Sequence, residues 1–202
     1  MKDDAPAGLK GLEEHIRRTV GMLDKVDYAA VLELVDKLHE AYERGKRVFI
    51  FGNGGSAASA SHFAEDLAKS TVPGMETARR LRVQSLTDSV PFISALGNDW
   101  GYDTVFREQL VTNAEPGDIA IAISGSGNSP NVVRAIEWAR SHGLFTCGFT
   151  GFSGGKLKEI VHLAIHSPVD DMEIAENCHM IEIHLAVGGL RRKIRDAARD
   201  GA

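Results

Sequence analysis

The sequence has few cysteines and no long apolar run. Only two cysteines, Cys147 and Cys178, occur among 202 residues, which is too few for a disulfide framework, so we expect reduced core thiols. No run reaches the roughly 18 apolar residues of a membrane span, and we expect no membrane partner. The first ten residues carry acids among the lysines and lack the apolar stretch of a secretory signal, which favours a cytoplasmic protein.

An excess of positive charge is also absent. The formal net charge is −5 at pH 7, whereas binding to a nucleic-acid backbone usually requires a basic domain with clustered Lys and Arg. Two short basic clusters, at residues 79–82 and 191–195, are interpreted as solvated surfaces. We therefore expect no nucleic-acid partner.

Helical periodicity dominates the first quarter of the chain. Residues 28–44 repeat apolar side chains at the spacing of one helix face, with Asp27 placed to cap the start and Gly45 to end the helix. A weaker pattern over 9–23 predicts a preceding helix. We interpret residues 1–45 as helices for packing or oligomerisation and residues 46–202 as one domain. The two helices could pack on that domain or on a partner subunit.

From Arg47 onward, short β-branched or aromatic runs alternate with helical segments, which is typical of βαβ units. The sequence predicts an α/β fold with a three-layer, doubly wound, five-stranded parallel sheet of flavodoxin-like type. A long final helix is expected over about 172–198. The five predicted strands are residues 48–51, 81–86, 119–124, 145–150 and 163–166.

Glycine- and serine-rich segments follow the first and third predicted strands. Ligands of such folds bind beyond the carboxyl ends of the strands. Serine hydroxyls and the free N–H groups of a helix start suit the oxygens of a phosphate monoester. The alternative is that these residues only make tight turns and caps, with Ser129 as the cap before Pro130. The segments are Gly52-Asn53-Gly54-Gly55-Ser56 and Ser124-Gly125-Ser126-Gly127-Asn128-Ser129.

Two nucleotide-binding interpretations fit less well. The dinucleotide fingerprint would need an acid about 20 residues after the first loop, and the window of residues 70–74 contains none. Neither loop ends in the Gly-Lys-Ser/Thr of a P-loop. A nicotinamide enzyme and a nucleoside triphosphatase are therefore disfavoured.

Acids and histidines recur at helical spacing in two segments. His62 and Asp66 stand four apart, and Glu176 and His184 lie about two turns apart in the final helix. Two histidines and two carboxylates would suit zinc or another divalent cation. On periodicity alone, a solvated helix face with ordinary ion pairs is the favoured alternative.

These motifs resemble the sugar isomerase (SIS) domain family, and within it the sedoheptulose 7-phosphate isomerases, or phosphoheptose isomerases, from about residue 20 to 195. The resemblance implies an aldose–ketose isomerase that converts sedoheptulose 7-phosphate to D-glycero-D-manno-heptose 7-phosphate through an enediolate. It also implies a homotetramer with sites between subunits and a divalent metal, zinc. The motifs that carry it are Gly52 to Ser56, His62-Phe63-Ala64-Glu65, Gly97-Asn98-Asp99, Ser124 to Ser129 and His184.

The resemblance also implies residue roles. Asp66 and His184 would be the acid–base pair, and both would join His62 and Glu176 as metal ligands. The implied substrate contacts are Asn53, Gly54, Gly55, Ser56, Asp66, Asn98, Asp99, Ser124, Gly125, Ser126, Ser129 and Glu176.

The chain departs from the family pattern at four places. It has Asp66 for Glu, Glu176 for Gln, Gly125 for Thr and Ser70 for Arg. The shorter acid reduces the reach of a base, the added carboxylate would tighten a cation, and the glycine removes a hydroxyl. A non-catalytic SIS protein that binds a sugar phosphate or a protein such as a replication initiator, and an isomerase of another sugar phosphate, remain alternatives.

Overall fold

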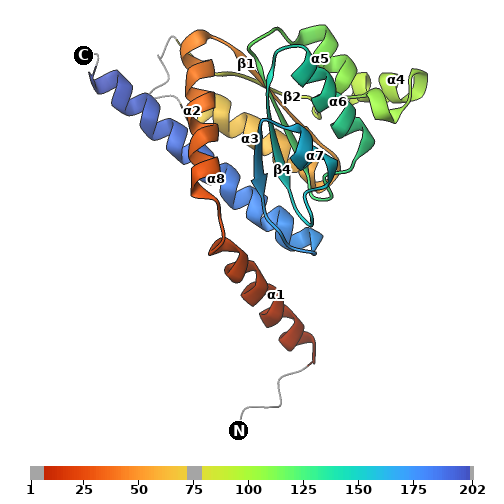
Figure 1. Cartoon of the computed structure of the whole chain (residues 1–202), viewed down its shortest axis with the longest axis vertical. Helices are drawn as coiled ribbons and strands as arrows, with labels where there is room; N and C mark the ends of the chain where they lie inside the picture. The colour runs from red at the N-terminus through yellow and green to blue at the C-terminus, as the bar shows by residue number, and fades with distance from the viewer. Residues whose placement is uncertain (1–6, 72–78, 201–202) are drawn as a thin grey trace.

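Five parallel strands form the sheet at the centre of the molecule (Figure 1). The computed structural model describes residues 7–71 and 79–200. The sheet order is β2-β1-β3-β4-β5, which confirms the predicted doubly wound fold. The strands are β1 (Arg47–Gly52), β2 (Arg82–Ser85), β3 (Ile119–Ser124), β4 (Phe145–Thr150) and β5 (Leu163–His166).

The central strands are buried on both faces, whereas β2 is an exposed edge. All six residues of β3 are buried, and Val48 of β1 pairs with Ile119 on one side and Val83 on the other. Strand β2 covers residues 82–85 rather than the predicted 81–86. Leu81 and Leu86 are buried, but they lie beyond the end residues of this short edge strand, whose ladder has only one neighbour.

Two helical layers cover the sheet. On one face, Ile50, Ile121 and Phe149 pack against three helices, and on the other, Phe49 and Phe51 pack against four shorter ones. The first layer contains α2 (Tyr28–Arg44), α3 (Gly55–Lys69) and α8 (Met172–Asp200). The second contains α4 (Val90–Asp99), α5 (Arg107–Asn113), α6 (Pro130–Ser141) and α7 (Gly155–Ile160), with the 3₁₀ turn η1 (Tyr102–Thr104) between α4 and α5.

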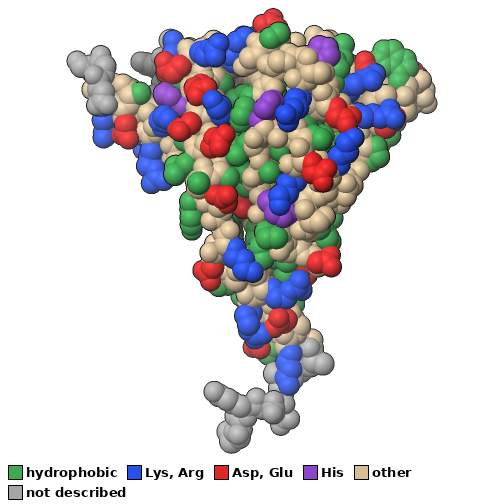
Figure 2. Space-filling view, viewed as in Figure 1, with side chains coloured by type: hydrophobic (Ala, Val, Ile, Leu, Met, Phe, Trp, Pro, Cys, Tyr) green, Lys and Arg blue, Asp and Glu red, His purple; other side chains and the backbone are tan. Residues whose placement is uncertain are grey.

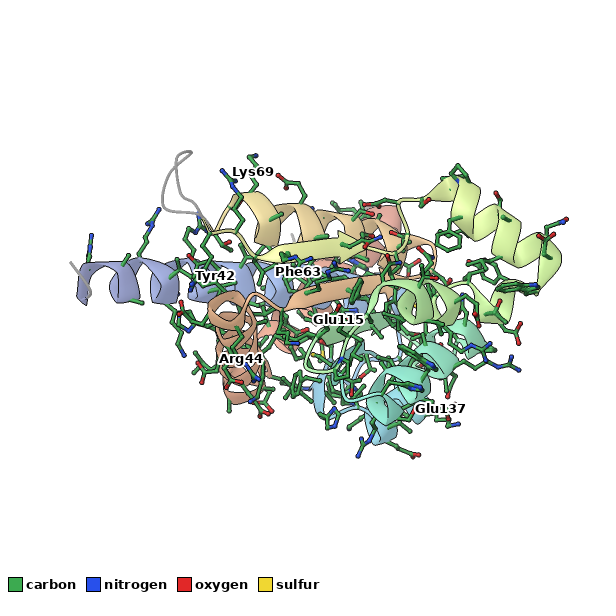
Figure 3. The ribbon with its side chains drawn as sticks, turned by 90° about the horizontal axis from the view of Figure 1, so that it is seen from above. Tyr42, Arg44, Phe63, Lys69, Glu115 and Glu137 are labelled. Atoms are coloured by element: carbon green, nitrogen blue, oxygen red, sulfur yellow. The ribbon has the colours of Figure 1, made fainter. Side chains whose placement is uncertain are left out.

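Figure 3 shows the same layers from above. Phe63 of α3 lies in the interior, where its ring makes an edge contact with Phe149 of β4 at 6.1 Å between centroids. Lys69 and Glu137 lie on opposite outer sides. Both cysteines are buried and free, as expected for core thiols.

The two amino-terminal helices behave differently. Asp27 Oδ1 accepts a hydrogen bond from the Ala30 N–H at 3.0 Å, and α2 packs its apolar face into the core. Helix α1 (Ala7–Leu23) projects away from the body (Figure 1). Among the side chains of α1 that the structure describes, Met22 is buried and packs against α8, while Arg18 pairs with Asp171 just before that helix. Of the two predicted arrangements, α2 packs on the domain, while α1 leaves apolar side chains uncovered within this chain: Leu9, Leu12, Ile16 and Val20.

The surface carries mixed charge. On the face seen in Figure 2, Lys and Arg side chains alternate with Asp and Glu, and no continuous basic area covers it. Within the described residues, no helix combines the length and apolarity needed to cross a membrane.

Candidate active site

The loops after β1 and β3 lie side by side because these strands are neighbours in the sheet. Gly52 allows their close approach, since a Cβ there would lie 2.6 Å from the Ile123 carbonyl oxygen and 2.8 Å from Ser56 Cβ. Asn53 and Asn131 join the loops by two reciprocal amide hydrogen bonds of 2.9 Å. The two predicted phosphate-binding segments therefore form one structural unit.

A cavity of about 210 Å³ lies between the loops and the start of α8. Ser56 and Ser124 are almost fully buried in its wall. Ser129 precedes α6 as predicted, but its side chain makes no capping hydrogen bond; instead its Oγ lies 3.5 Å from Ser124 Oγ. The lining residues are Asn53, Ser56, Ile123, Ser124, Gly125, Ser126, Ser129, Met172 and Glu176.

A third loop, residues 151–155 after β4, and the start of α7 support the serine loop, which is the segment Ser124–Ser129 after β3. Gly127 has φ +67°, and a Cβ there would overlap the carbonyl oxygen of Gly154. The Gly127 carbonyl accepts a hydrogen bond from the Leu157 N–H at 2.9 Å, and Asn128 Oδ1 accepts one from the Lys156 N–H at 3.0 Å. The bracing role of this loop was not predicted from the sequence, although its glycines after a predicted strand were a usable signal.

His62, Asp66 and His184 form a cluster beside the cavity helices. Asp66 Oδ2 lies 3.4 Å from His62 Nε2 and 3.8 Å from His184 Nε2, and the two Nε2 atoms are 3.4 Å apart. Asp66 Oδ1 accepts a hydrogen bond from Ser70 Oγ at 3.0 Å. The histidine side chains are about half exposed, at 47% and 50%, so a ligand can reach them from solvent.

This donor set fits a divalent cation. Tetrahedral zinc with bonds of about 2.0–2.1 Å places its ligand atoms about 3.3 Å apart, close to the spacings within the cluster. Ligand atoms of His62, Asp66 and His184 all lie within 4.8 Å of one another. The fourth predicted ligand, Glu176, is not part of this group: a Cβ on Gly55 would lie 2.5 Å from Glu176 Oε1. The structure thus brings together three of the four predicted ligands.

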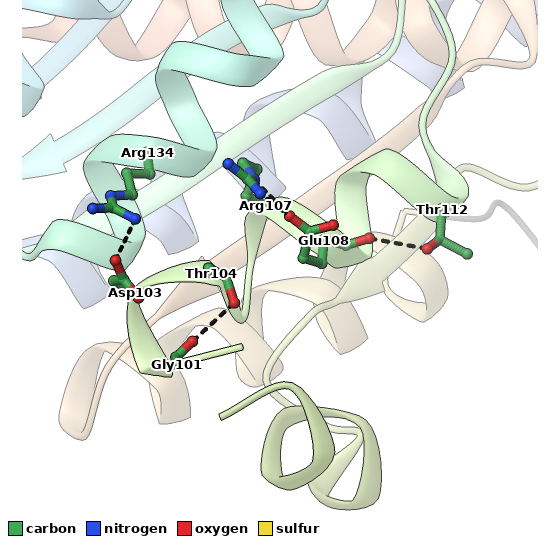
Figure 4. A network of polar contacts seen from close by, with 7 residues as sticks. All are labelled: Gly101, Asp103, Thr104, Arg107, Glu108, Thr112 and Arg134. Atoms are coloured by element: carbon green, nitrogen blue, oxygen red, sulfur yellow. Dashed lines mark hydrogen bonds and ion pairs between the residues drawn. The ribbon is translucent and has the colours of Figure 1, made fainter. Parts of the chain in front are cut away.

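Asn98 and Asp99 lie outside the cavity of their own chain. Both are exposed at the end of α4, where Asn98 Nδ2 donates to Asp99 Oδ1 at 2.7 Å. The turn that follows is fixed near the first loop, because the Tyr102 hydroxyl donates to Asn53 Oδ1 at 2.9 Å. An ion pair between Asp103 and Arg134 holds this turn on α6 (Figure 4).

Three residues of the site, Tyr102, Asn131 and Met172, were not predicted from the sequence. Asn131 is 2% exposed and Tyr102 is exposed, and neither stands in a recognisable motif. Each contacts the site through residues distant in the chain, so no local pattern could have indicated it.

His179 and Glu182 of α8 point into the core, where they are 1% and 2% exposed. Burial lowers the pKa of His179 to about 4, and burial raises the pKa of Glu182 to about 7. The Ser167 hydroxyl donates to Glu182 Oε1 at 3.2 Å, which offsets part of that rise. Both groups are therefore structural features of the α8–sheet interface, separate from the cavity.

A wider hollow of about 620 Å³ lies along α3 and β2. It is lined by Glu65, Gln84 and Asp88 among others, and it contains no residue of either glycine loop. The smaller cavity lies at the β1/β3 position where the strand order changes direction, which is where ligands of doubly wound sheets bind. We therefore take the smaller cavity as the candidate site.

Known proteins resemble this chain over most of its length. The family model described as SIS domain matches residues 13–151. A phosphoheptose isomerase of Trichlorobacter lovleyi is 36% identical, with 87% of this chain and 88% of the relative covered. One of Mycobacterium bovis is 39% identical, with 80% and 81% covered. A solved phosphoheptose isomerase structure from Francisella tularensis has a TM-score of 0.86 at 24% identity, covering 93% of this chain and all of that one, and shares the fold. The chain belongs to the SIS domain family, among the phosphoheptose isomerases.

Proposed function

We propose that this protein is an aldose–ketose isomerase that interconverts sedoheptulose 7-phosphate and D-glycero-D-manno-heptose 7-phosphate. Relatives that are 36% and 39% identical over the aligned residues are named phosphoheptose isomerases. One observation carries the proposal: the same two helices, α3 and α8, line the loop cavity at one end and hold the His62–Asp66–His184 cluster further along.

The spacing of these two features suits a long open-chain sugar phosphate. Ser56 lines the cavity, and His62 follows six residues later, about 9 Å along α3 at a rise of ~1.5 Å per residue. Eight bonds separate C1 from the phosphorus of a heptose 7-phosphate, and an extended chain of that length spans roughly 9 Å. The phosphate would then lie in the cavity while C1 and C2 reach the cluster.

Hydroxyls and backbone amides bind the phosphate in this proposal. Ser124, Ser126 and Ser129 donate to its oxygens, and the start of α6, directly after Ser129, adds the partial positive charge of a helix N-terminus. Asn53 uses its side-chain amide on Asn131 and Tyr102, so we assign it to holding the loops together.

Asp66 and His184 carry the proton transfers. The Asp66 carboxylate takes a proton from C1 of the ketose, the electrons of that C–H bond form the C1=C2 double bond, and O2 gains a proton from His184. The enediol then loses its O1 proton to His184, the carbonyl forms at C1, and C2 takes the proton back from Asp66. No proton or electron pair is gained or lost overall.

We also propose that His62, Asp66 and His184 would hold a divalent metal, for which zinc suits the nitrogen and oxygen donors. The two roles compete, because an Asp66 or His184 atom that ligates the ion cannot transfer a proton at the same time. Such an ion would supply positive charge that polarises the substrate oxygens. Ligation by Glu176 would require its carboxylate to leave Gly55, so we assign it first to the sugar hydroxyls.

We further propose a cytoplasmic homo-oligomer, a tetramer with sites between subunits. Leu12 and Ile16 of α1 are 68% and 63% exposed, which favours burial of these side chains against a second copy of the chain. Asn98 and Asp99 are exposed at the end of α4, and a neighbouring subunit's site would give them a substrate to contact.

The test is direct conversion of the substrate. Purified protein is mixed with sedoheptulose 7-phosphate in ²H₂O and followed by NMR, with and without a chelator. We expect the aldose to appear with deuterium at C2, and chelation to slow it. A chain that binds sedoheptulose 7-phosphate yet neither converts it nor exchanges its C1 protons would contradict the proposal.

A further inference from the structure

One wall of the cavity between the loops carries hydrogen-bond donors, and the opposite wall carries side chains without donors. The loop after β3 contributes the hydroxyls of Ser124, Ser126 and Ser129, whereas the start of α8 contributes Met172 and Glu176. A thioether and an ionised carboxylate provide no hydrogen-bond donor. A phosphate dianion in this cavity would therefore turn its oxygens toward the serines and its ester side toward α8.

Met172 and Gly125 fit together in this second wall. A Cβ on Gly125 would overlap Met172 Sδ and lie 3.1 Å from Met172 Cε. The methionine thus occupies the space that any side chain at position 125 would need. Because a methionine side chain is flexible, a larger residue at 125 would push the thioether aside and reshape the cavity without breaking the fold.

The positions of Met172 and Glu176 along α8 indicate how a sugar phosphate would lie in the cavity. Glu176 follows Met172 by one helical turn, so both side chains share a face. Met172 contacts the serine loop at Gly125, while the Glu176 carboxylate lies over Gly55 of the first loop. A carboxylate repels a phosphate and accepts hydrogen bonds from hydroxyls. In a bound sugar phosphate, the carbon that carries the phosphate would therefore contact the Met172 thioether, and the sugar hydroxyls further along would contact Glu176.

We propose that Met172 is a specificity-determining residue that selects sugar phosphates whose phosphate is esterified to an unbranched CH₂ group. This rests on the proposed function in that the cavity holds the substrate's phosphate. A CH₂ group presents only C–H bonds to the sulfur. Met172 is 39% exposed, so the contact would involve the part of its side chain that faces the cavity. A secondary, ring-carbon phosphate would place a branched carbon with a second polar substituent against that part, and the polar atoms covered there would lose water without a new partner.

Two isomeric ligands test this selection. Glucose 6-phosphate carries its phosphate on CH₂, whereas glucose 1-phosphate carries it on a ring carbon, with the same composition. By calorimetric titration, we expect the wild-type protein to bind the 6-phosphate about 10- to 100-fold more tightly. In Met172→Ala the ratio should fall to within about threefold. Val111→Ala, which truncates an exposed side chain of α5 outside the cavity, should keep the wild-type ratio.

A double-mutant cycle tests the fit between the two residues. Gly125→Ala should weaken binding of glucose 6-phosphate about tenfold in the wild-type background and by less than about twofold in Met172→Ala, because the displaced thioether is then absent. Additive effects, or an unchanged ligand ratio in Met172→Ala, would overturn the inference.

The inference and the proposed function fail separately. Selection of the primary phosphate that depends on Met172, without conversion of sedoheptulose 7-phosphate, would leave this inference standing and refute the isomerase. Conversion of sedoheptulose 7-phosphate, together with a ratio of the two glucose phosphate affinities that is unchanged in Met172→Ala, would support the isomerase and refute this inference. Failure to bind either sugar phosphate or inorganic phosphate would contradict both.

Discussion

Asp66 is held through both oxygens of its carboxylate. Oδ2 faces His62 and His184, while Oδ1 accepts the hydrogen bond from Ser70 Oγ. Two of the departures from the family pattern, the shorter acid and the serine in place of arginine, are therefore in contact. Ser70 lies one helical turn after Asp66, and its hydroxyl fixes the orientation of the shorter acid.

Replacing Asp66 by Asn should abolish most turnover and preserve the fold. The amide keeps the shape but cannot take a proton at C1, so we expect kcat to fall by about 10²- to 10⁴-fold. Turnover of sedoheptulose 7-phosphate measures this, and circular dichroism checks the fold. Ser70→Ala is the matched control, with a loss below about tenfold since only one hydrogen bond is removed. Wild-type activity in Asp66→Asn would remove this residue from the mechanism.

His179 and Glu182 give the folded state opposite pH dependences. The pKa of Glu182 rises on folding from 4.5 to about 7, so the native state binds more protons and stability falls as the pH rises through that range. The pKa of His179 falls on folding from 6.5 to about 4, so its contribution is lost as the pH falls through that range.

The Glu182→Gln variant isolates one of these effects. Gln keeps the acceptor for Ser167 but cannot ionise, so the decline between about pH 4.5 and 7 should disappear. From pH 5 to 8 we expect the wild-type free energy of unfolding to drop by about 2–3 kcal/mol relative to the variant. Urea unfolding at both pH values measures the difference. Parallel curves for the two proteins would show that burial of this carboxyl carries no such cost.

At the scale of elements, the sequence predicts the sheet well because its central strands are nearly continuous apolar runs. Strands β3, β4 and β5 begin and end where the pattern placed them. The bounds of the other edge strand, β2, were predicted less well, because two of its four residues are exposed and carry a weaker apolar signal. The contacts that complete the site, such as that of Gly125 with Met172, join residues far apart in the chain. The periodicity of the sequence cannot predict such contacts.

The brace between the third loop and the serine loop can be tested with two glycines of similar backbone conformation. Gly45 and Gly127 have φ of +65° and +67°, but a Cβ on Gly45 has nothing within 4 Å. Gly45→Ala should therefore cost only the strain of the left-handed conformation, about 1 kcal/mol. Gly127→Ala should cost a further 1–3 kcal/mol, roughly, for the overlap with Gly154.

The same pair separates stability from function. Because the serine loop must move to accommodate a methyl group at position 127, KM for sedoheptulose 7-phosphate should rise in Gly127→Ala and stay unchanged in Gly45→Ala. Thermal unfolding and steady-state kinetics measure both effects. Equal behaviour of the two variants would contradict the brace.

At the scale of the whole molecule, α1 is the element that this chain alone does not explain. Its stripe of exposed apolar side chains should hold a second copy, because such a surface is costly to leave in water. We expect the Leu12→Asp, Ile16→Asp double variant to lower the mass by light scattering from an oligomer toward the 21.8 kDa chain. Glu13→Ala, on the same helix, should not. A monomeric wild-type protein would contradict this assignment.

The central claim is that one sugar phosphate spans the loop cavity and the His62–Asp66–His184 cluster. A crystal structure of the Asp66→Asn variant with sedoheptulose 7-phosphate tests it most directly. The account predicts phosphate oxygens within hydrogen-bonding distance of Ser124, Ser126 and Ser129, with C1 and C2 beside residue 66. Phosphate bound elsewhere, or a sugar whose reacting carbons lie away from the cluster, would contradict it.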